Sequence, residues 1–423
     1  MSTLRPREGR QGVHPVGLRR RRPILRHGPQ RTPRAFGQLM SLLGIALAVV
    51  LVSTVGVVAF VATQLASTAA ENTVTLDDTA ELPPDIGAYE GGFNVLLVGI
   101  DKCEKDIADL FGNRCDDKKQ SGKLNDVNLL VHVSNDPRRV TVVSFPRDMM
   151  VGQPECTDDN GTVHRETSRA AMNEAYGRGG LNCVAKTVSE LSGEQVTFAA
   201  SVTFGGVIEV TDAIGGVEVC LASPIDDPLT GLHLPAGTRE LQGLEALNFL
   251  RTRHGLVGGS DLSRIGNQQQ YMSSLVRKLT SAEVLGNVGT VLRLASIGVK
   301  RSELSDKLDP MRIAQIGLAI KDVPPADYVF LQYPVFDDPS NSSKVVPDEA
   351  SAEEMWTAIA ENRPLEVTHK RGTQEGVVDA PGQTTAPTPP TPTPGATDGA
   401  VALPPNVKGQ NAETRTCSNG NGR

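Results

Sequence analysis

Aspartate side chains stand where predicted strands begin or end. Asp101 directly follows the apolar run FNVLLVGI (93–100), and Asp126 opens the next such run, DVNLLVHV (126–133). Two carboxylates at adjacent strand ends can hold one hard divalent cation, because Mg²⁺ is usually bound by one or two carboxylates together with substrate phosphates. We therefore predict a site for Mg²⁺, or alternatively Mn²⁺, at Asp101 and Asp126. For either residue alone, a turn or a cap is the alternative role.

Arginine side chains gather in the segment LNFLRTRHGLVGGSDLSRIGNQQQ (247–270). Two of them end a predicted helix at a glycine-rich loop, and the polar residues after the loop recur at spacings of three and four, which places them on one helical face. Guanidiniums beside a metal-bound carboxylate predict a pyrophosphate site, because a planar guanidinium matches phosphate oxygens with two parallel hydrogen bonds. A solvated charged face is the alternative. The predicted members are Arg251, Arg253, Asp261, Arg264 and Gln268, together with Arg147 from the tripeptide Pro146-Arg147-Asp148.

Motifs that would supply a protein nucleophile are missing from the sequence: GxSxG, HExxH, CxxC and the P-loop GxxxxGK[ST] do not occur. Phosphoryl transfer needs charge neutralisation and alignment of the reacting groups more than it needs such a nucleophile. The combination of cations and a metal site therefore favours phosphoryl transfer, with a substrate hydroxyl as the attacking group.

Apolar strands alternate with helical patterns from residue 92 onward. Strands are predicted at 93–100, 126–133 and 139–145, and helices at 244–250 and 261–279. This alternation predicts a layered α/β sandwich. A formal charge of −7 excludes a uniformly basic protein that coats nucleic acid, and an aromatic content of 4% argues against stacking on bases.

A single membrane anchor is predicted near the N-terminus. No charged residue occurs between Arg34 and Glu71, and Leu42 to Thr63 is almost wholly apolar, long enough for a helix to span a bilayer. We predict a transmembrane helix at 37–66. Ten Arg and one Glu give residues 1–36 a net charge of +9, so this disordered arm stays cytoplasmic and the rest of the chain, at −16, lies outside the membrane. A cleaved signal peptide is the alternative.

The external part divides into three predicted regions. Residues 67–91 are polar and proline-broken and predict a stalk, residues 92–370 predict the catalytic domain (core 92–280), and residues 371–423 predict a Thr/Pro-rich disordered tail.

Six cysteines agree with an oxidising exterior, although they allow fifteen complete pairings. Each of two polar segments is bracketed by nearby cysteines, which favours the disulfides Cys103–Cys115 and Cys156–Cys183. Cys220 follows an apolar run and is predicted to be a buried thiol, and Cys417 remains unassigned.

The motifs that run in order along the chain resemble the LytR-CpsA-Psr family of wall-polymer transferases. The combination of PRD with RxR…DxxRxxxQ is the most specific part of the likeness, which covers about residues 92–280. The matching pieces are NVLLVGID (94–101), NDVNLLVHV (125–133), VTVVSFPRD (140–148), NEAYGRGG (173–180), DAIGGVEV (212–219), GLHLPAGTRELQGLEALNFLRTR (231–253) and DLSRIGNQQQ (261–270).

The resemblance implies a three-layer α/β/α sandwich with a mixed central sheet and a hydrophobic tunnel for a polyprenyl chain. It implies transfer of a phosphoglycan from a polyprenyl-pyrophosphate carrier to peptidoglycan, which forms a phosphodiester in the presence of Mg²⁺. By position, Asp101 and Asp126 would hold the metal, and Asp261 would orient the cluster or act as a base. The pyrophosphate would be held by Arg147, Arg251, Arg253, Arg264 and Gln268.

Three other functions remain open on the sequence alone. A membrane-anchored pyrophosphatase would use water as the acceptor, a regulator would bind the lipid without turnover, and a structural wall anchor would work through its Thr/Pro tail. The partners expected for the leading hypothesis are the lipid-linked glycan, peptidoglycan and the membrane, without nucleic acid.

Overall fold

A computed structural model describes the part of the chain that follows the predicted anchor. The predicted arm (1–36), transmembrane segment (37–66) and Cys103 lie outside the described residues, and among those described no helix is long and apolar enough to cross a membrane. The described residues are 67, 73–77, 82, 88–102, 104–115, 124–158, 160–372, 375–381 and 399–422.

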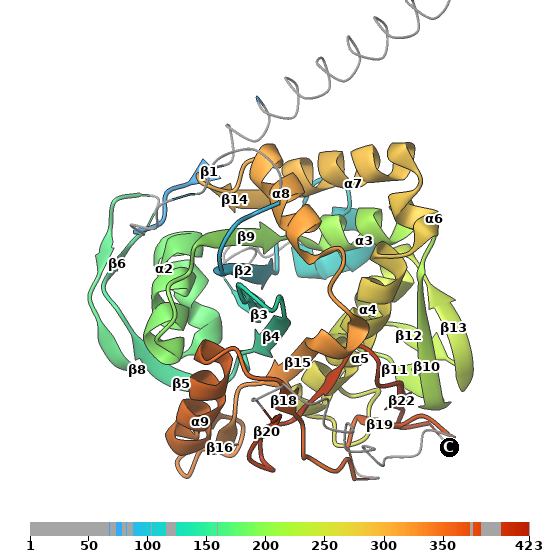
Figure 1. Cartoon of the computed structure of the whole chain (residues 1–423). Coiled ribbons are helices and arrows are strands. Elements are labelled where there is room, and N and C mark those ends of the chain that lie inside the picture. Colours follow the sequence, from blue (N-terminus) through green and yellow to red (C-terminus); the bar gives the residue numbers. More distant parts are fainter. Residues whose placement is uncertain are drawn as a thin grey trace, which may run out of the picture. The chain divides into compact units, whose positions relative to one another are not determined.

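A mixed sheet of eight strands forms the centre of the fold (Figure 1). β2 runs antiparallel to β3 and parallel to β9, and β15 runs parallel to β4, so both directions occur, as predicted. In order across the sheet the strands are β1 (Thr73–Val74), β14 (Ser302–Ser305), β9 (Phe198–Val202), β2 (Phe93–Ile100), β3 (Asn125–Val133), β4 (Val140–Ser144), β15 (Tyr328–Gln332) and β21 (Gly409–Asn411).

Alternating residues of β2 divide the interior into two cores, because successive side chains of a strand point to opposite faces. Leu96 and Val98 join a core with α2 (Ala175–Ser192) and α9 (Glu349–Ala360). Phe93 packs on the other face, towards α5 (Asp261–Leu279) and α8 (Pro310–Ile320). Helices therefore cover both faces of the sheet (Figure 1).

The face that carries α5 also carries α3 (Phe204–Ala213), α4 (Gly243–Arg251), α6 (Ala282–Leu285) and α7 (Val288–Arg301). Short 3₁₀ helices lie at Ala108–Cys115, Met172–Glu174 and Pro325–Asp327. The remaining strands are β5 (Met150–Gln153), β6 (Cys156–Thr157), β7 (Val163–His164), β8 (Thr167–Ala171), β10 (Val217–Ser223), β11 (Ile225–Asp227), β12 (Leu232–Leu234), β13 (Gly237–Leu241), β16 (Val335–Asp337), β17 (Val345–Pro347), β18 (Leu365–Glu366), β19 (Val377–Asp379), β20 (Val401–Ala402) and β22 (Thr416–Asn419).

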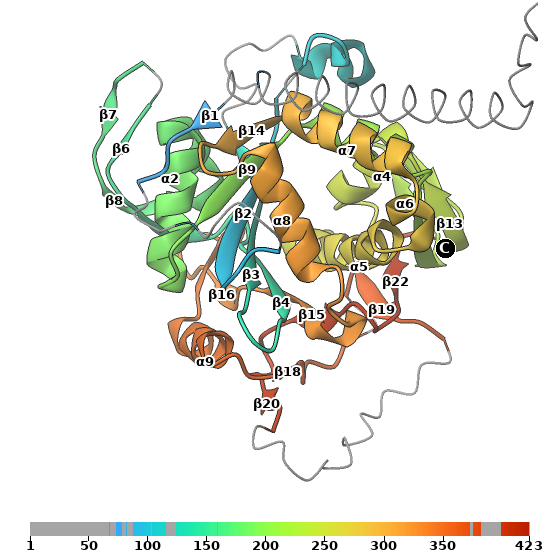
Figure 2. The ribbon, with the colours of Figure 1, turned by 45° about the horizontal axis from the view of Figure 1, so that its top comes forward.

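The chain after residue 371 is not a disordered tail where it is described, so that prediction was wrong. β21 pairs with β15 at the edge of the central sheet, and β22 lies between β10 and β19 in a second sheet of four strands. Figure 2 shows β22 and β19 beside α5. The Thr/Pro-rich stretch 382–398 lies outside the described residues. Short, polar strands gave no periodic signal, and their pairing with distant strands holds them in place.

The predicted stalk (67–91) also contributes to the fold. β1 pairs with β14, and Leu76 and Tyr89 are buried in the two cores. Parts of the predicted stalk therefore belong to the folded domain, and β1 forms an edge strand of its central sheet.

Two disulfides are present among the described cysteines. Cys156–Cys183 was predicted and is confirmed. Cys220 is bonded to Cys417, so the prediction of a buried thiol was wrong, because the two cysteines meet only when β10 and β22 pair. The predicted Cys103–Cys115 pair includes a residue outside the described part of the chain.

Candidate active site

β2 and β3 bring Asp101 and Asp126 to the same end of neighbouring strands. The pairing shifts by one residue opposite Gly99–Ile100, so Asp126 is the extra residue of a β-bulge. Bulges often occur beside active sites, where they re-aim a side chain out of the strand's alternation. The amide of Asp101 donates to the carbonyl of Leu124 at 3.3 Å, which holds the end of β2 against the start of β3.

The carboxylates of Asp101 and Asp126 are the type of ligand that a hard divalent cation prefers, but two side chains are too few to complete its coordination. Among the described residues no group of three or more His, Cys, Asp or Glu side chains could hold a metal ion. Mg²⁺ commonly takes only one or two carboxylates when substrate phosphates supply further oxygens. A cation held by these two carboxylates would need further oxygens, which a phosphorylated ligand could supply.

Arg147 follows β4 and joins three carboxylates. Its Nη1 donates to Oδ1 of Asp126 at 2.7 Å, and its Nε lies 3.3 Å from Oδ1 of Asp261 and 3.5 Å from Oδ2 of Asp148. Burial alone lowers the pKa of Arg147, but the carboxylates of Asp126 and Asp261 outweigh it and raise the pKa above its usual range. The guanidinium therefore stays charged.

The first turn of α5 supplies the next two charges. Ser260 caps the helix, since its side chain accepts from the amide of Ser263 at 3.1 Å. Nη2 of Arg264 lies 2.7 Å from Oδ1 of Asp261 and donates to the backbone carbonyl of Asp126 at 2.9 Å. Burial raises the pKa of Asp261 against the pull of Arg264 and Arg147, and burial lowers the pKa of Arg264.

Hydrogen bonding in this group is incomplete. Both carboxylate oxygens of Asp261 and the Nε atoms of Arg147 and Arg264 are buried without a hydrogen-bond partner among the described residues. Their charges attract one another, yet the donors and acceptors are poorly aligned. Such unsatisfied polar atoms are rare in folded proteins and often mark functional sites. We call the side chains of Asp126, Arg147, Asp148, Asp261 and Arg264 the site cluster.

Asp227 positions the turn that carries Arg253. This fully buried carboxylate accepts from the hydroxyl of Thr252 at 2.6 Å and from the amide of Arg253 at 3.3 Å. Burial raises the pKa of Asp227, but these hydrogen bonds outweigh it and lower the pKa below its usual value. The Arg253 guanidinium is near enough to the carboxylates of Asp148 and Asp261 to help lower the pKa of Asp148 and to oppose the rise that burial causes in the pKa of Asp261.

The C-terminal strands hold the glycine-rich loop between Arg253 and α5. Asn421 donates from its side chain to the carbonyl of His254 at 2.7 Å, and the amide of Val257 donates to the carbonyl of Asn419 at 2.9 Å. The segment predicted to be a free tail therefore shapes the loop that separates the predicted site arginines.

Gln268 lies one turn beyond Arg264 on α5. Its side-chain nitrogen donates to the carbonyl of Leu250 at 2.9 Å and so ties α5 to the last turn of α4. The bonded carbonyl directly precedes Arg251, the final residue of α4, and both Gln268 and Arg251 line the adjoining cavity.

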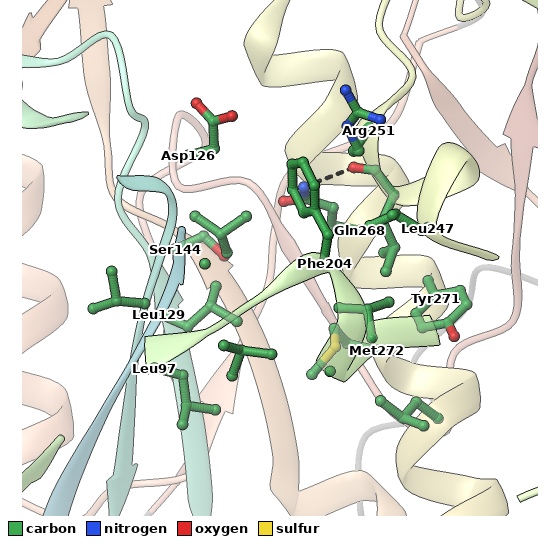
Figure 3. Close-up of a pocket in the computed structure, with 18 of the residues that line it drawn as sticks. Leu97, Asp126, Leu129, Ser144, Phe204, Leu247, Arg251, Gln268, Tyr271 and Met272 are labelled. Carbon is green, nitrogen blue, oxygen red and sulfur yellow. Dashed lines mark hydrogen bonds between the residues drawn. The ribbon is translucent and has the colours of Figure 1, made fainter. Parts of the chain in front are cut away.

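A cavity of about 320 Å³ runs between the sheet and helices α3, α4 and α5. Figure 3 shows Leu97 and Leu129 on the sheet side and Leu247 and Met272 on the helix side. Asp126 and Arg251 lie toward the same end of the cavity, Asp126 on the sheet side and Arg251 on the helix side. The walls are thus apolar, while the polar lining includes Asp126, Arg251, Arg264 and Gln268. A cavity of this kind suits a molecule with a hydrocarbon chain and an anionic head.

Two further residues support the site, and neither was among its predicted members. Nζ of Lys344 lies 2.6 Å from Oδ1 of Asp148, and this pair with Arg147 lowers the pKa of Asp148, although burial opposes it. Asn125 is fully buried, donates to the carbonyl of Met172 at 3.0 Å and accepts from the amide of Tyr176 at 3.0 Å, which anchors α2 to β3. Each depends on contacts with a distant part of the chain, so spacing could not reveal them.

Comparisons with known proteins identify relatives of this chain. The protein "Cell wall biosynthesis protein LcpA" of Corynebacterium glutamicum is 34% identical over 254 residues, which cover 53% of this chain and 46% of that protein. "Polyisoprenyl-teichoic acid--peptidoglycan teichoic acid transferase TagT" of Bacillus subtilis is 29% identical over 245 residues, covering 56% and 68%. The match thus spans about half the length of LcpA.

Among solved structures, protein gbs0355 of Streptococcus agalactiae has the same fold, with a TM-score of 0.51 and 20% identity over 64% of this chain and 87% of that one. The model of the LytR_cpsA_psr family matches residues 57–361, which is most of the chain. The chain therefore belongs to the LytR_cpsA_psr family.

Proposed function

We propose that the protein transfers a phosphoglycan from a polyprenyl-pyrophosphate carrier to peptidoglycan and forms a phosphodiester. The observation that carries this proposal is the cavity, whose apolar walls end at Asp126, Arg251 and Arg264. Hydrocarbon walls match a polyprenyl chain, and guanidiniums match a pyrophosphate. The name of TagT, which describes transfer of polyisoprenyl-linked teichoic acid to peptidoglycan, supports the same class of reaction.

The reaction needs an acceptor hydroxyl and a stabilised leaving group. The acceptor oxygen bonds to the phosphorus that carries the glycan, the bond from this phosphorus to the bridging oxygen breaks, and polyprenyl phosphate leaves. The hydroxyl proton passes to solvent. Arg147, Arg251, Arg253 and Arg264 neutralise the charge that develops on the phosphate oxygens, and Asp261 orients Arg147 and Arg264.

Asp101 and Asp126 would hold Mg²⁺, or Mn²⁺, which when bound would neutralise part of the pyrophosphate charge. Gln268 keeps α4 and α5 together beside the phosphate position.

We further propose a cell-membrane location with a single pass, a cytoplasmic N-terminus and an external catalytic domain. The apolar run that precedes the domain supports a membrane anchor. The two disulfides support an oxidising compartment.

The proposal is tested by incubating the full-length chain in detergent with a lipid-pyrophosphate-linked sugar, peptidoglycan fragments and Mg²⁺. We expect a sugar–phosphate–peptidoglycan conjugate, identified by mass spectrometry, together with polyprenyl phosphate. Lipid cleavage without conjugate would replace the transferase with a pyrophosphatase. Lipid binding without cleavage would leave a regulator.

A further inference from the structure

Residues 104–115 place an aromatic side chain at the charged end of the cavity. The ring of Phe111, in the 3₁₀ helix Ala108–Cys115, lies 5.3 Å from the ring of Phe204, centroid to centroid. Phe204 begins α3 and lines the cavity (Figure 3). The segment between the two predicted metal ligands therefore reaches the site through this ring contact.

Arg251 lies against both rings. Its guanidinium carbon is 4.7 Å from the centre of Phe204 and 5.5 Å from the centre of Phe111. Both distances are within the range in which a cation is attracted to the face of an aromatic ring. Ring contacts leave the N–H groups of a guanidinium able to donate, so they can fix its plane while it binds an anion.

A separate group of charges attaches residues 104–115 to α3 and α7. Arg301, which is 7% exposed, donates from Nη1 to Glu104 at 2.9 Å and to Asp106 at 3.1 Å, and from Nε to Glu209 at 3.2 Å. We call these four side chains the Arg301 cluster. Glu104 also accepts from the amide of Gly205 at 2.9 Å. A Cβ at Gly205 would collide with the Glu104 carboxylate, so glycine permits this close approach.

We propose that Phe111 is a positioning residue for the lipid pyrophosphate. Together with Phe204 it fixes the plane of the Arg251 guanidinium towards the pyrophosphate, and the Arg301 cluster fixes the segment that carries Phe111. This inference rests on the proposed function, since it assigns the pyrophosphate of the donor lipid to Arg251. It makes residues 104–115 a part of the donor site that selects pyrophosphate heads.

The alternative is that Phe111 only covers apolar surface, and two substitutions separate these roles. Phe111→Tyr keeps the aromatic face, whereas Phe111→Leu keeps an apolar side chain but removes the π-system that attracts Arg251. Leu110→Ala is the matched control, because Leu110 lies on the same 3₁₀ helix and is 49% exposed.

The experiment measures binding of geranylgeranyl pyrophosphate and of geranylgeraniol to the full-length chain in detergent. We expect the parental protein to prefer the pyrophosphate. Phe111→Leu should reduce this preference by about threefold or more, whereas Phe111→Tyr and Leu110→Ala should retain it. Thermal unfolding of each variant identifies any that fail to fold.

A double substitution keeps the test independent of general damage. In an Arg251→Gln background, Phe111→Leu should cause no further loss of the preference, because both changes act through one guanidinium. Equal preference in the parental protein for pyrophosphate and alcohol would reject the proposed function itself. A clear parental preference that Phe111→Leu leaves unchanged, or lowers equally with and without Arg251, would overturn the role of Phe111 alone. If Phe111→Leu does not fold, Phe111→Met takes its place under the same criteria.

Discussion

Two buried arginines, Arg301 and Arg264, show opposite ways of placing a guanidinium inside the protein. Arg301 donates from Nε, Nη1 and Nη2 to three carboxylates. Its pKa is raised because the hydrogen bonds that it donates to Asp106 and Glu209 outweigh burial. Arg264 is equally hidden, at 5% exposed, but its Nε has no hydrogen-bond partner among the described residues. Burial lowers its pKa despite the contact with Asp261.

This difference distinguishes an arginine that stabilises the fold from an arginine that is suited to bind a ligand. In the Arg301 cluster three carboxylates surround one cation, so no further anion is attracted. In the site cluster three carboxylates face Arg147 and Arg264, and Arg253 and Lys344 lie close to Asp148, so the cations outnumber these carboxylates by one. Local positive charge and unused hydrogen bonds are what an anionic substrate requires, and the fold tolerates their cost because other regions are well satisfied.

The largest effect is expected from removing the predicted cation ligands. Asp126→Ala and Asp101→Ala should each lower turnover about a hundredfold, or ~2.7 kcal/mol, and abolish its dependence on Mg²⁺. The double substitution should add little, since both act through one ion. Turnover measured against Mg²⁺ concentration checks this. Asp106→Asn, in the Arg301 cluster, is the control and should keep the Mg²⁺ response. Additive losses that leave the response intact would contradict the metal site.

Arg264→Lys should affect both activity and stability. Lysine keeps the charge but loses the planar fork, so turnover should fall by about tenfold or more, ~1.4 kcal/mol. The buried contact with Asp261 predicts that the free energy of unfolding also falls, by about 1–3 kcal/mol. Denaturant unfolding measures it.

Arg253→Lys is the matched variant for Arg264→Lys. It should lose comparable activity while its free energy of unfolding stays within about 0.5 kcal/mol of the parental value, since Arg253 is only half-buried. Equal losses of unfolding free energy in both variants would contradict the expectation that only Arg264 contributes to stability.

In contrast to the substitution of Arg253, Arg301→Met should lower stability strongly and activity only weakly. Its three carboxylates lose their shared partner, so the free energy of unfolding should fall by about 2 kcal/mol. Turnover should fall only about threefold, because the cluster acts on the site through Phe111 and Arg251. A fall in turnover far beyond threefold, with an unchanged free energy of unfolding, would place Arg301 in the reaction itself.

The smallest effect is a dependence on pH at Asp148. Burial raises its pKa, but the contacts with Lys344 and Arg147 outweigh it and lower the pKa below 3.8 in the folded chain. Its contribution to stability is therefore present above about pH 4 and is lost as the pH falls through the folded pKa. Asp148→Asn should lower the free energy of unfolding at pH 7 by about 0.5–1 kcal/mol, and the gap should close towards pH 2. A gap that is constant from pH 7 to pH 2 would rule out this titration.

The parts of the site that could be predicted lie on elements with a strong local pattern. Asp261, Arg264 and Gln268 occur at helical spacing, and α5 has the predicted bounds. The central strands are long apolar runs, so their positions were also predictable. The β-bulge at Asp126, the contact between Phe111 and Arg251, and the role of Asp227 depend on which distant segments meet, which local periodicity does not encode.

The C-terminal strands illustrate the same limit for the fold. Strands of two to four residues cannot show a period, and Gly and Asn, which occur in these strands, are depleted in strands generally. Only tertiary contacts reveal their place: Gln410 donates to the backbone carbonyl of Gln269 and to the side chain of Ser273, and Ser418 donates to Asn267, all on the buried face of α5.

The contacts of Asn419 and Asn421 with the loop at residues 254–257 also affect the order in which parts of the protein can fold. These partners are separated by more than 160 positions, and the Cys220–Cys417 bond spans 197. Long-range closures of this kind slow folding, because loop entropy is lost before the contact is made. During synthesis, the arginine loop emerges long before the strands that shape it. A nascent chain can thus form β2, β3 and β4 early, but the loop that follows Arg253 is held in place only after residue 421 has been made. Chains that stop earlier should therefore lack the proposed activity.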